Sequence, residues 1–367
     1  MSILLFIASS FTGSLKIFKT IVIFYTMIQS SLNIPSINFP VIRGLMFLLS
    51  YLYLAFHSLF FAVPEQLMIV YLIYPIIIFF FAVYGRLSLQ RLLVVCWLGL
   101  AVSTVYFLLR EFDYRATVIT DIVGLRYNEL GLFWKSRHFL AFFVAVLFSD
   151  LFIKGKKMLV LFLMILYLMM AIFSGSLSLL FSGILIPFIY ILVYFAFERG
   201  YLFFKLIVLF AFPFLSFLQI FIFLYLGIDS SNLDELGSLS LDSSRSFQGE
   251  ILLKEFLKDP LFGKGLGYVS PDLNRSEQYP WAVELSFMRI LRDFGLIGYG
   301  FLFLGGVAIL GKFHTLDDKM VKNVRPAIVG SLALLIAILP NPNFENFDVF
   351  LILIVPALVK NYHAASR

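Results

Sequence analysis

Arginines stand in two polar stretches of an otherwise apolar chain, and their side chains are suited to bind phosphate. The planar guanidinium group makes two charge-assisted hydrogen bonds at once to a phosphate diester or a pyrophosphate. Arg126 and Arg245 lie in separate stretches, so two guanidinium groups could approach one pyrophosphate from opposite sides. The alternative for each arginine is an ion pair with a nearby carboxylate or a contact with lipid head groups. Further candidates of the same kind are Arg137, Arg289 and Arg292.

Proton transfer needs a base, and the same stretches offer two candidates. Glu284 could accept a proton from an attacking hydroxyl, and its alternative role is that of a solvated carboxylate at the membrane surface. His138 is the histidine that we expect on the same side of the membrane. A further feature is the run Gly263-Lys264-Gly265, whose backbone amides could surround an anion. A tight turn after a helix is the more common use of such glycines.

Other kinds of site are missing from the sequence. It contains no Walker loop, no Cys/His spacing for zinc and no G-x-S-x-G element. The single cysteine, Cys96, lies in an apolar run, which excludes an internal disulfide framework. We therefore expect no metal ion and no cofactor.

The elements that position these residues must be membrane helices, because the composition is too apolar for a soluble domain. Hydrophobic residues make up 61% of the chain, charged residues make up 14%, and the mean hydropathy is +0.97. A soluble domain is about 45–50% apolar and about 25% charged. The bilayer is the solvent that accepts such a chain. The net charge of +6 then reflects orientation in the membrane and not nucleic-acid binding.

Stretches of roughly 17–25 mostly apolar residues mark spanning helices. We expect an all-α, polytopic protein with about 11 spans, within a range of about 10 to 12. The range arises because residues 1–30 are interrupted by Lys16 and Lys19 and could form one span or two. The other expected spans are Val41–Val63, Gln66–Tyr84, Leu92–Leu109, Phe139–Ile153, Met158–Phe173, Leu177–Phe197, Leu202–Leu226, Phe294–Leu310, Pro326–Leu339 and Phe347–Val359.

The short loops alternate between basic and uncharged, which predicts the orientation of the spans. The basic loops are Gly85–Arg91, Lys154–Lys157, Arg199–Lys205 and Lys312–Arg325. The loops without Lys or Arg are Pro64–Gln66, Ser174–Ser176 and Asn341–Asn346. Basic loops face the cytoplasm by the positive-inside rule. Two long loops, residues 110–135 and 227–280, then face outward, and we expect them to form the catalytic region of a single membrane domain, residues 1–367.

The larger outer loop should contain short helices. Residues Ser246–Leu257 place Phe247, Ile251 and Phe256 on one side of a helix, which we expect to lie in the membrane interface. Pro260 should end this helix, because proline cannot continue the hydrogen-bond ladder. Pro280 fits the first turn of the next helix, which would carry Glu284, Met288 and Arg292 along one stripe.

Taken in order, these segments resemble the O-antigen polymerase and O-antigen ligase family of bacterial envelopes. The resemblance rests on Arg245, then Asp259-Pro260-Leu261-Phe262-Gly263-Lys264-Gly265-Leu266-Gly267, then Phe294-Gly295-Leu296-Ile297-Gly298. Earlier segments that fit are Arg126 with Gly131, the Ser174-Gly175-Ser176 turn and Arg137-His138-Phe139-Leu140-Ala141. The resemblance covers roughly Arg126 to Gly298.

The resemblance implies a helical membrane glycosyltransferase of the GT-C type in the bacterial inner membrane, active at the periplasmic face. Its donor would be a glycan on undecaprenyl pyrophosphate, and arginines would offset the charge on the leaving pyrophosphate without a metal. A separate co-polymerase that controls chain length is implied as a partner. Ligases of the family carry a histidine where this chain has Glu284, which favours a polymerase. The alternatives are the ligase itself and a flippase for the lipid-linked unit.

Overall fold

The computed structural model describes residues 41–60, 65–111, 138–173, 177–198, 243–273, 285–310, 318–338 and 352–365. All regular elements in these ranges are helices, and the ranges contain no strand. The helices are α3 (Val41–Phe60), α4 (Glu65–Met68), the π-helix η2 (Ile69–Ile73), α5 (Tyr74–Tyr84), α6 (Leu89–Glu111), α9 (Phe139–Ile153), α10 (Lys157–Phe173), α11 (Leu177–Glu198), α13 (Ser243–Lys258), α14 (Ser286–Leu310), α15 (Asp318–Ile338) and α17 (Val355–Ala365).

Four helices among the described residues are long and apolar enough to span a membrane. Their apolar windows are Val41–Ser58, Leu179–Phe197, Phe287–Ile309 and Met320–Ile338. Shorter apolar helices accompany them, at Tyr71–Tyr84, Leu89–Val105, Phe139–Ile153 and Lys157–Ile172. The protein is therefore helical and membrane-embedded. The expected span Leu202–Leu226, the first forty residues and residues 347–351 of the expected span Phe347–Val359 lie outside the described residues.

The outward sides of the helices carry large apolar side chains, as a surface in contact with lipid requires. On α11 the exposed large apolar residues are Phe181, Ile184, Phe188, Ile191 and Phe195, spaced by three or four positions. That spacing places them on one helical face. The opposite face of α11 packs against α10 and α15.

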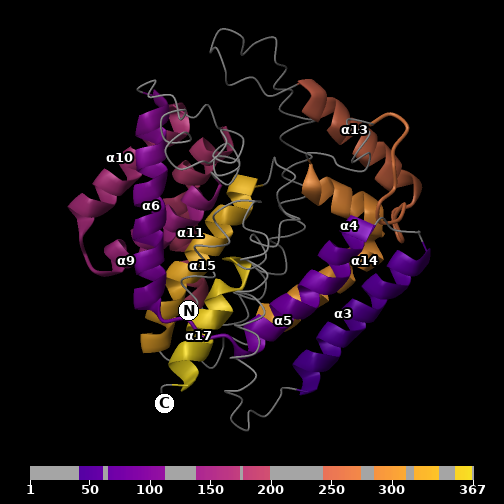
Figure 1. Ribbon diagram of the computed structural model, residues 1–367, viewed down its shortest axis with the longest axis horizontal. Coiled ribbons are helices and arrows are strands. Elements are labelled where there is room, and N and C mark those ends of the chain that lie inside the picture. Colours follow the sequence, from indigo (N-terminus) through magenta and orange to yellow (C-terminus); the bar gives the residue numbers. More distant parts are fainter. Residues whose placement is uncertain are drawn as a thin grey trace, which may run out of the picture.

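One group of helices surrounds α9. Side chains are buried all along this helix from Phe139 to Leu151, which is why its sequence is apolar on every side. It packs against α15, α6 and α10, and α15 in turn packs against α11 and α17 (Figure 1). The helix has the bounds that were expected for the span Phe139–Ile153.

A second group is formed by α3, α5, α13 and α14, and it lies beside the first (Figure 1). Two polar side chains close the ends of its helices by donating to terminal carbonyls, which have no partner inside a helix. Asn361 of α17 donates to Ala82 (2.8 Å) and Gly85 (3.2 Å) at the end of α5. Arg43 of α3 donates to the Ile309 carbonyl at the end of α14.

The fold differs from the expectation at α14. The expected span began near Phe294, but the helix begins at Ser286 and contains a break at Gly295, where φ is 62° and ψ is −172°. The apolar stretch was read from Phe294 because charged residues precede it, and these are buried inside the protein. In the same way, α15 begins at Asp318 and not at Pro326.

The helix α13 also differs from the expectation, in the face that it buries. The expected apolar side was Phe247, Ile251 and Phe256, whereas the structure buries Leu252 and Glu255 and leaves Ile251 and Phe256 half-buried. The acidic residue is buried because it pairs with an arginine of α14, the helix on which α13 packs. The helix ends at Lys258, just before Pro260, as expected.

Candidate functional site

The turn that follows α13 joins the break in α14 through backbone hydrogen bonds. On the N-terminal side of the break, the carbonyls of Arg292 and Asp293 accept from Lys264 (2.8 Å) and Gly265 (3.0 Å) of the turn. On the C-terminal side, the amides of Leu296 and Ile297 donate to Pro260 (2.9 Å) and Leu261 (3.1 Å). We call this arrangement of residues 260–265 and 292–297 the turn–break junction.

The hydrogen bonds explain how a broken helix persists in a span. A break frees carbonyls before it and amides after it, and unpaired backbone groups are very unfavourable in lipid. The turn supplies a partner on each side of the break. The two sequence segments that carried the family resemblance, which are about thirty residues apart, therefore form one structural unit.

Two glycines make the close approach possible. Gly263 has φ 75° and Gly295 has φ 62°, a region that other residues rarely adopt. A Cβ on Gly263 would lie 2.5 Å from the Asp293 carbonyl oxygen, and a Cβ on Gly295 would lie 2.6 Å from the Gly263 nitrogen. Both contacts are with backbone, which cannot move aside cheaply.

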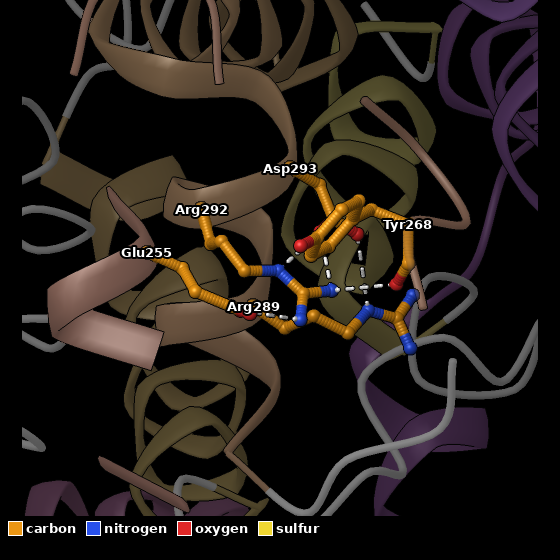
Figure 2. Close-up of polar contacts among 5 residues, drawn as sticks. All are labelled: Glu255, Tyr268, Arg289, Arg292 and Asp293. Atoms are coloured by element: carbon orange, nitrogen blue, oxygen red, sulfur yellow. Dashed lines mark hydrogen bonds and ion pairs between the residues drawn. The ribbon is translucent and has the colours of Figure 1, made fainter. Parts of the chain in front are cut away.

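A buried ion-pair cluster lies against the junction, with Arg292 at its centre (Figure 2). The guanidinium group of Arg292 contacts the Asp293 carboxylate at 2.6 Å through Nη2 and at 2.7 Å through Nε. Its Nη1 lies 3.4 Å from Glu255 Oε2, and its Nη2 donates to the Tyr268 carbonyl at 3.3 Å. The Tyr268 ring covers it, with Cζ 5.3 Å from the ring centroid. Arg292 is only 1% exposed, so these contacts hold it in place.

Arg289 belongs to the same buried cluster. Its Nε lies 3.4 Å from Asp293 Oδ2, one helical turn along α14. Its guanidinium group lies on the side of Asp293 away from Glu255 (Figure 2). Two arginines and two carboxylates give the cluster a formal charge of zero, which is what burial at this depth requires.

The ring of Phe294, next to the cluster, is contacted by two side chains from other helices. His57 of α3 lies 4.8 Å from it and Tyr71 of η2 lies 5.3 Å from it, centroid to centroid. The site thus draws on α3, η2, α13, α14 and the turn.

The structure describes only some of the predicted site residues. Arg126, Arg137 and Glu284 lie outside the described residues, as does the expected helix start at Pro280. Arg245 lies in the first turn of α13, and its side chain is also outside the described part.

The other predicted residues fall into two places. His138 is buried at the start of α9, in the group of helices that surrounds α9. Gly263, Lys264 and Gly265 lie in the turn, which packs against α14, the helix that carries the cluster arginines Arg289 and Arg292. Here the amides of Lys264 and Gly265 donate to backbone carbonyls, so these glycines form a tight turn. The Lys264 ammonium group pairs with Asp259.

Sequence reasoning missed several residues that the structure places at the site. Asp293 and Glu255 were not singled out, although Asp293 stands four positions after Arg289, the spacing of a helical ion pair. Sequence reasoning singled out only His138 as an outer histidine, whereas the structure places His57, in the last turn of α3, against Phe294. The signal was available, since the predicted orientation already placed that end of the helix outside.

The described residues contain no group of three or more His, Cys, Asp or Glu side chains arranged to hold a metal ion. Comparison of the chain with family models, with curated proteins and with solved structures finds no match.

Proposed function

We propose that the protein is a membrane glycosyltransferase that polymerises lipid-linked oligosaccharide repeat units, of the O-antigen polymerase type. The observation that carries the proposal is the turn–break junction. It unites the Pro260–Gly267 and Phe294–Gly298 segments, on which the resemblance rests, and it places them against a cluster that contains two arginines. A polar structure built into one end of an apolar helix group is a plausible place to bind a charged lipid head group.

In the proposed reaction a sugar hydroxyl of one unit attacks the anomeric carbon of the growing chain. The new glycosidic bond forms as the bond from that carbon to the pyrophosphate oxygen breaks, and the lipid pyrophosphate leaves with the electron pair. Arg126 and Arg245 would hold the donor pyrophosphate and offset its growing charge. Glu284 would take the hydroxyl proton, and His138 is the other predicted base.

The contacts within the cluster distinguish two of the arginine candidates, Arg292 and Arg289. Arg292 is surrounded by Asp293, Glu255 and Tyr268, so its role is to hold α13 and the turn against α14. Arg289 is also buried, but it lies on the side of Asp293 away from Glu255 and stays a candidate for substrate binding (Figure 2). Arg126 and Arg245 remain the proposed pyrophosphate ligands.

The same proposal implies a topology, a location, substrates and a partner for the protein. The protein would have about 11 spans and a GT-C-like arrangement, in the bacterial inner membrane with the site facing the periplasm. Undecaprenyl-pyrophosphate glycans would be both donor and acceptor, and a chain-length-determining co-polymerase would be a partner. A ligase that transfers the glycan to lipid A core would use the same donor chemistry.

One observation favours a second candidate, a transporter of the lipid-linked unit. Broken helices with charged residues inside a span are typical of transporters, and α14 has both features. In α14, however, the turn pairs with the backbone groups on both sides of the break, whereas a transporter leaves such groups to coordinate its substrate. The enzyme is therefore the preferred proposal.

Deleting the gene in its host and analysing the lipopolysaccharide separates the three functions. Loss of a polymerase leaves lipid A core that bears one repeat unit. Loss of a ligase leaves bare core, with polymer stranded on the lipid carrier. Loss of a transporter leaves bare core and single repeat units on the cytoplasmic face. Either of the last two results would overturn the polymerase proposal.

A further inference from the structure

A patch of exposed apolar side chains lies across the turn–break junction. Its four members are each more than half exposed, and they are Leu257 (64%), Leu261 (54%), Phe262 (61%) and Leu296 (55%). Leu257 belongs to the last turn of α13, Leu296 directly follows the break in α14, and the other two lie in the turn. The Leu296 amide donates to the Pro260 carbonyl at 2.9 Å, so the patch spans both segments of the junction. We call these four residues the junction patch.

The packing of α14 on α3 shows how deep the junction patch lies in the membrane. Three contacts that are spaced by seven residues on each helix connect Arg43 to the Ala308 carbonyl, Ser50 to the Phe301 carbonyl at 2.6 Å, and the ring of His57 to that of Phe294 at 4.8 Å. The two helices are therefore antiparallel, and Leu296 lies level with Ala55. Ala55 is inside the apolar window of α3, Val41–Ser58. The break, and the turn that is bonded to it, thus lie within the apolar length of α3.

The face of α3 that points away from the protein is apolar to the same depth. Large exposed residues recur on it every three or four positions, at Leu45, Leu48, Leu52 and Phe56. That spacing places them on one helical face, and such a face on a spanning helix indicates hydrocarbon around it. Phe56 directly precedes the residue that contacts the Phe294 ring, so the apolar face reaches the level of the break. The bilayer therefore extends to the depth of the junction patch.

The polar groups beside the patch are compatible with insertion into lipid. The Lys264 ammonium group pairs with the Asp259 carboxylate, so these two charges of the turn offset each other. The carbonyls of Pro260 and Leu261 accept from α14, which matters because unpaired backbone groups are very unfavourable in lipid. Lys258 is exposed at the end of α13, and its long side chain can lie along an apolar surface while its ammonium group reaches the head groups.

We propose that the turn after α13 is inserted in the bilayer. The four side chains of the junction patch enter the hydrocarbon of the leaflet on the side of the site, and Lys258 lies among the head groups. The membrane contact that was expected along one face of α13 is thereby assigned to the end of that helix and to the turn. Insertion holds the turn against α14 from the lipid side, and it does not depend on the proposed function.

The depth of the junction patch favours the bilayer as the occupant of this surface. Exposed apolar patches mark contacts with proteins or with membranes. A soluble partner does not reach a surface that lies level with residues inside the apolar window of a spanning helix. The alternative occupant is therefore a second membrane-embedded chain, and the experiment distinguishes it from lipid.

The test places a fluorescent NBD label on Phe262→Cys, in protein reconstituted in liposomes at a low ratio of protein to lipid. Spin labels on the lipid acyl chains quench NBD in hydrocarbon, and iodide quenches NBD in water. Leu48→Cys is the lipid-facing control, because Leu48 is exposed in the middle of α3. Glu250→Cys is the control on α13, because Glu250 is polar and exposed. The native Cys96 is buried, so it should give little background.

We expect the acyl-chain spin labels to quench the label on Phe262→Cys at least about half as strongly as the label on Leu48→Cys, and the label on Glu250→Cys less than about a fifth as strongly. Iodide should give the reverse order. Quenching of the Phe262→Cys label by iodide and not by lipid would overturn the proposal. Protection from both quenchers would also overturn it, since that result describes cover by another chain. If Phe262→Cys does not accumulate, a label on Leu257→Cys decides the same question.

A second measurement tests whether insertion supports the junction. Phe262→Asp places a charge in hydrocarbon, which is unfavourable, whereas Phe262→Leu stays apolar. The amides of Leu296 and Ile297 donate to the turn, so their hydrogen exchange in lipid nanodiscs reports the opening of the junction. We expect this exchange to be about tenfold faster in Phe262→Asp and within about twofold of wild type in Phe262→Leu. Equal exchange in the two variants would show that insertion does not hold the turn. If wild-type protein makes no polymer, the proposed function fails and both measurements still decide the insertion.

Discussion

The Asp293 carboxylate forms ion pairs with two arginines, Arg292 and Arg289, and the rest of the cluster distinguishes them. Arg292 also contacts Glu255 and Tyr268, which belong to α13 and the turn. It is therefore the residue that ties three separate segments together. We therefore expect Arg292 to act on stability, and the proposed contacts with substrate belong to other arginines.

The expected result of Arg292→Ala is a large loss of stability. The substitution leaves Glu255 and Asp293 buried without their main partner, and breaking a buried ion pair in this way costs about 3–5 kcal/mol. Thermal unfolding in detergent measures the effect. Lys264→Ala is the control, because the Lys264–Asp259 pair is partly exposed and such pairs contribute about 0–1 kcal/mol. Equal stabilities for the two variants would contradict the assigned role.

Arg245 is expected to act on turnover instead. Lysine keeps the charge but loses the bidentate geometry, so Arg245→Lys should lower polymer formation by about 10²-fold, as loss of one oxyanion donor does.

Glu284→Gln should lose polymer formation while donor binding survives, because an amide cannot accept the proton. The assay compares polymer ladders and donor binding at matched membrane levels, with Arg275→Ala as the tolerated control. Wild-type ladders from both variants would remove the proposed site.

At the scale of elements, the junction depends on two glycines that face each other. Gly263→Ala and Gly295→Ala each place a Cβ against backbone atoms in a left-handed region. The conformation alone costs about 1–2 kcal/mol, and the clash adds to it, so both variants should unfold at lower temperature. Gly300→Ala is the control on the same helix, because its Cβ would meet no atom within 4 Å. If all three variants match wild type, the junction as described is wrong.

The length of a continuous apolar stretch predicted the bounds of a helix well where the ends of that helix carry no charge. The span Phe139–Ile153 was predicted at both ends, because a helix buried on every side is a continuous apolar run. The same criterion placed the start of the α14 span near Phe294, eight residues after the helix begins at Ser286. The sequence placed Met288 and Arg292 on a helix but kept the charged residues out of the span, and the ion pairs that allow Arg289, Arg292 and Asp293 to be buried in it could not be predicted from apolar length.

The segments of the site could be predicted one by one, but the contacts between them could not. The glycines of the turn and the Phe294–Gly298 segment were recognised, but nothing in the sequence states that they bond to each other. The pairing depends on a reversal of the chain after α13 and on Gly295 leaving the helical conformation. Glu255 and His57 escaped notice because each comes from another helix and gains its place at the site by contact alone.

On the scale of the whole molecule, the orientation of the loops can be tested with cysteine labels. Lys156 and Asp272 are both exposed, and the native Cys96 is buried, so it should give little background. We expect an impermeant maleimide to label Asp272→Cys from the outside of intact spheroplasts, and to label Lys156→Cys only after the membrane is opened. Labels with the opposite sidedness would invert the topology and place the junction in the cytoplasm.

The most direct test of the central claim uses purified protein in liposomes with lipid-linked repeat units and excess EDTA. Wild-type protein and Gly300→Ala should both extend the units into a ladder without added metal, whereas Gly295→Ala should not, because the turn can no longer approach the break. A ladder that depends on added magnesium or calcium would show that a metal site has been missed. Transfer of intact units across the bilayer with no ladder would contradict the account and identify a transporter.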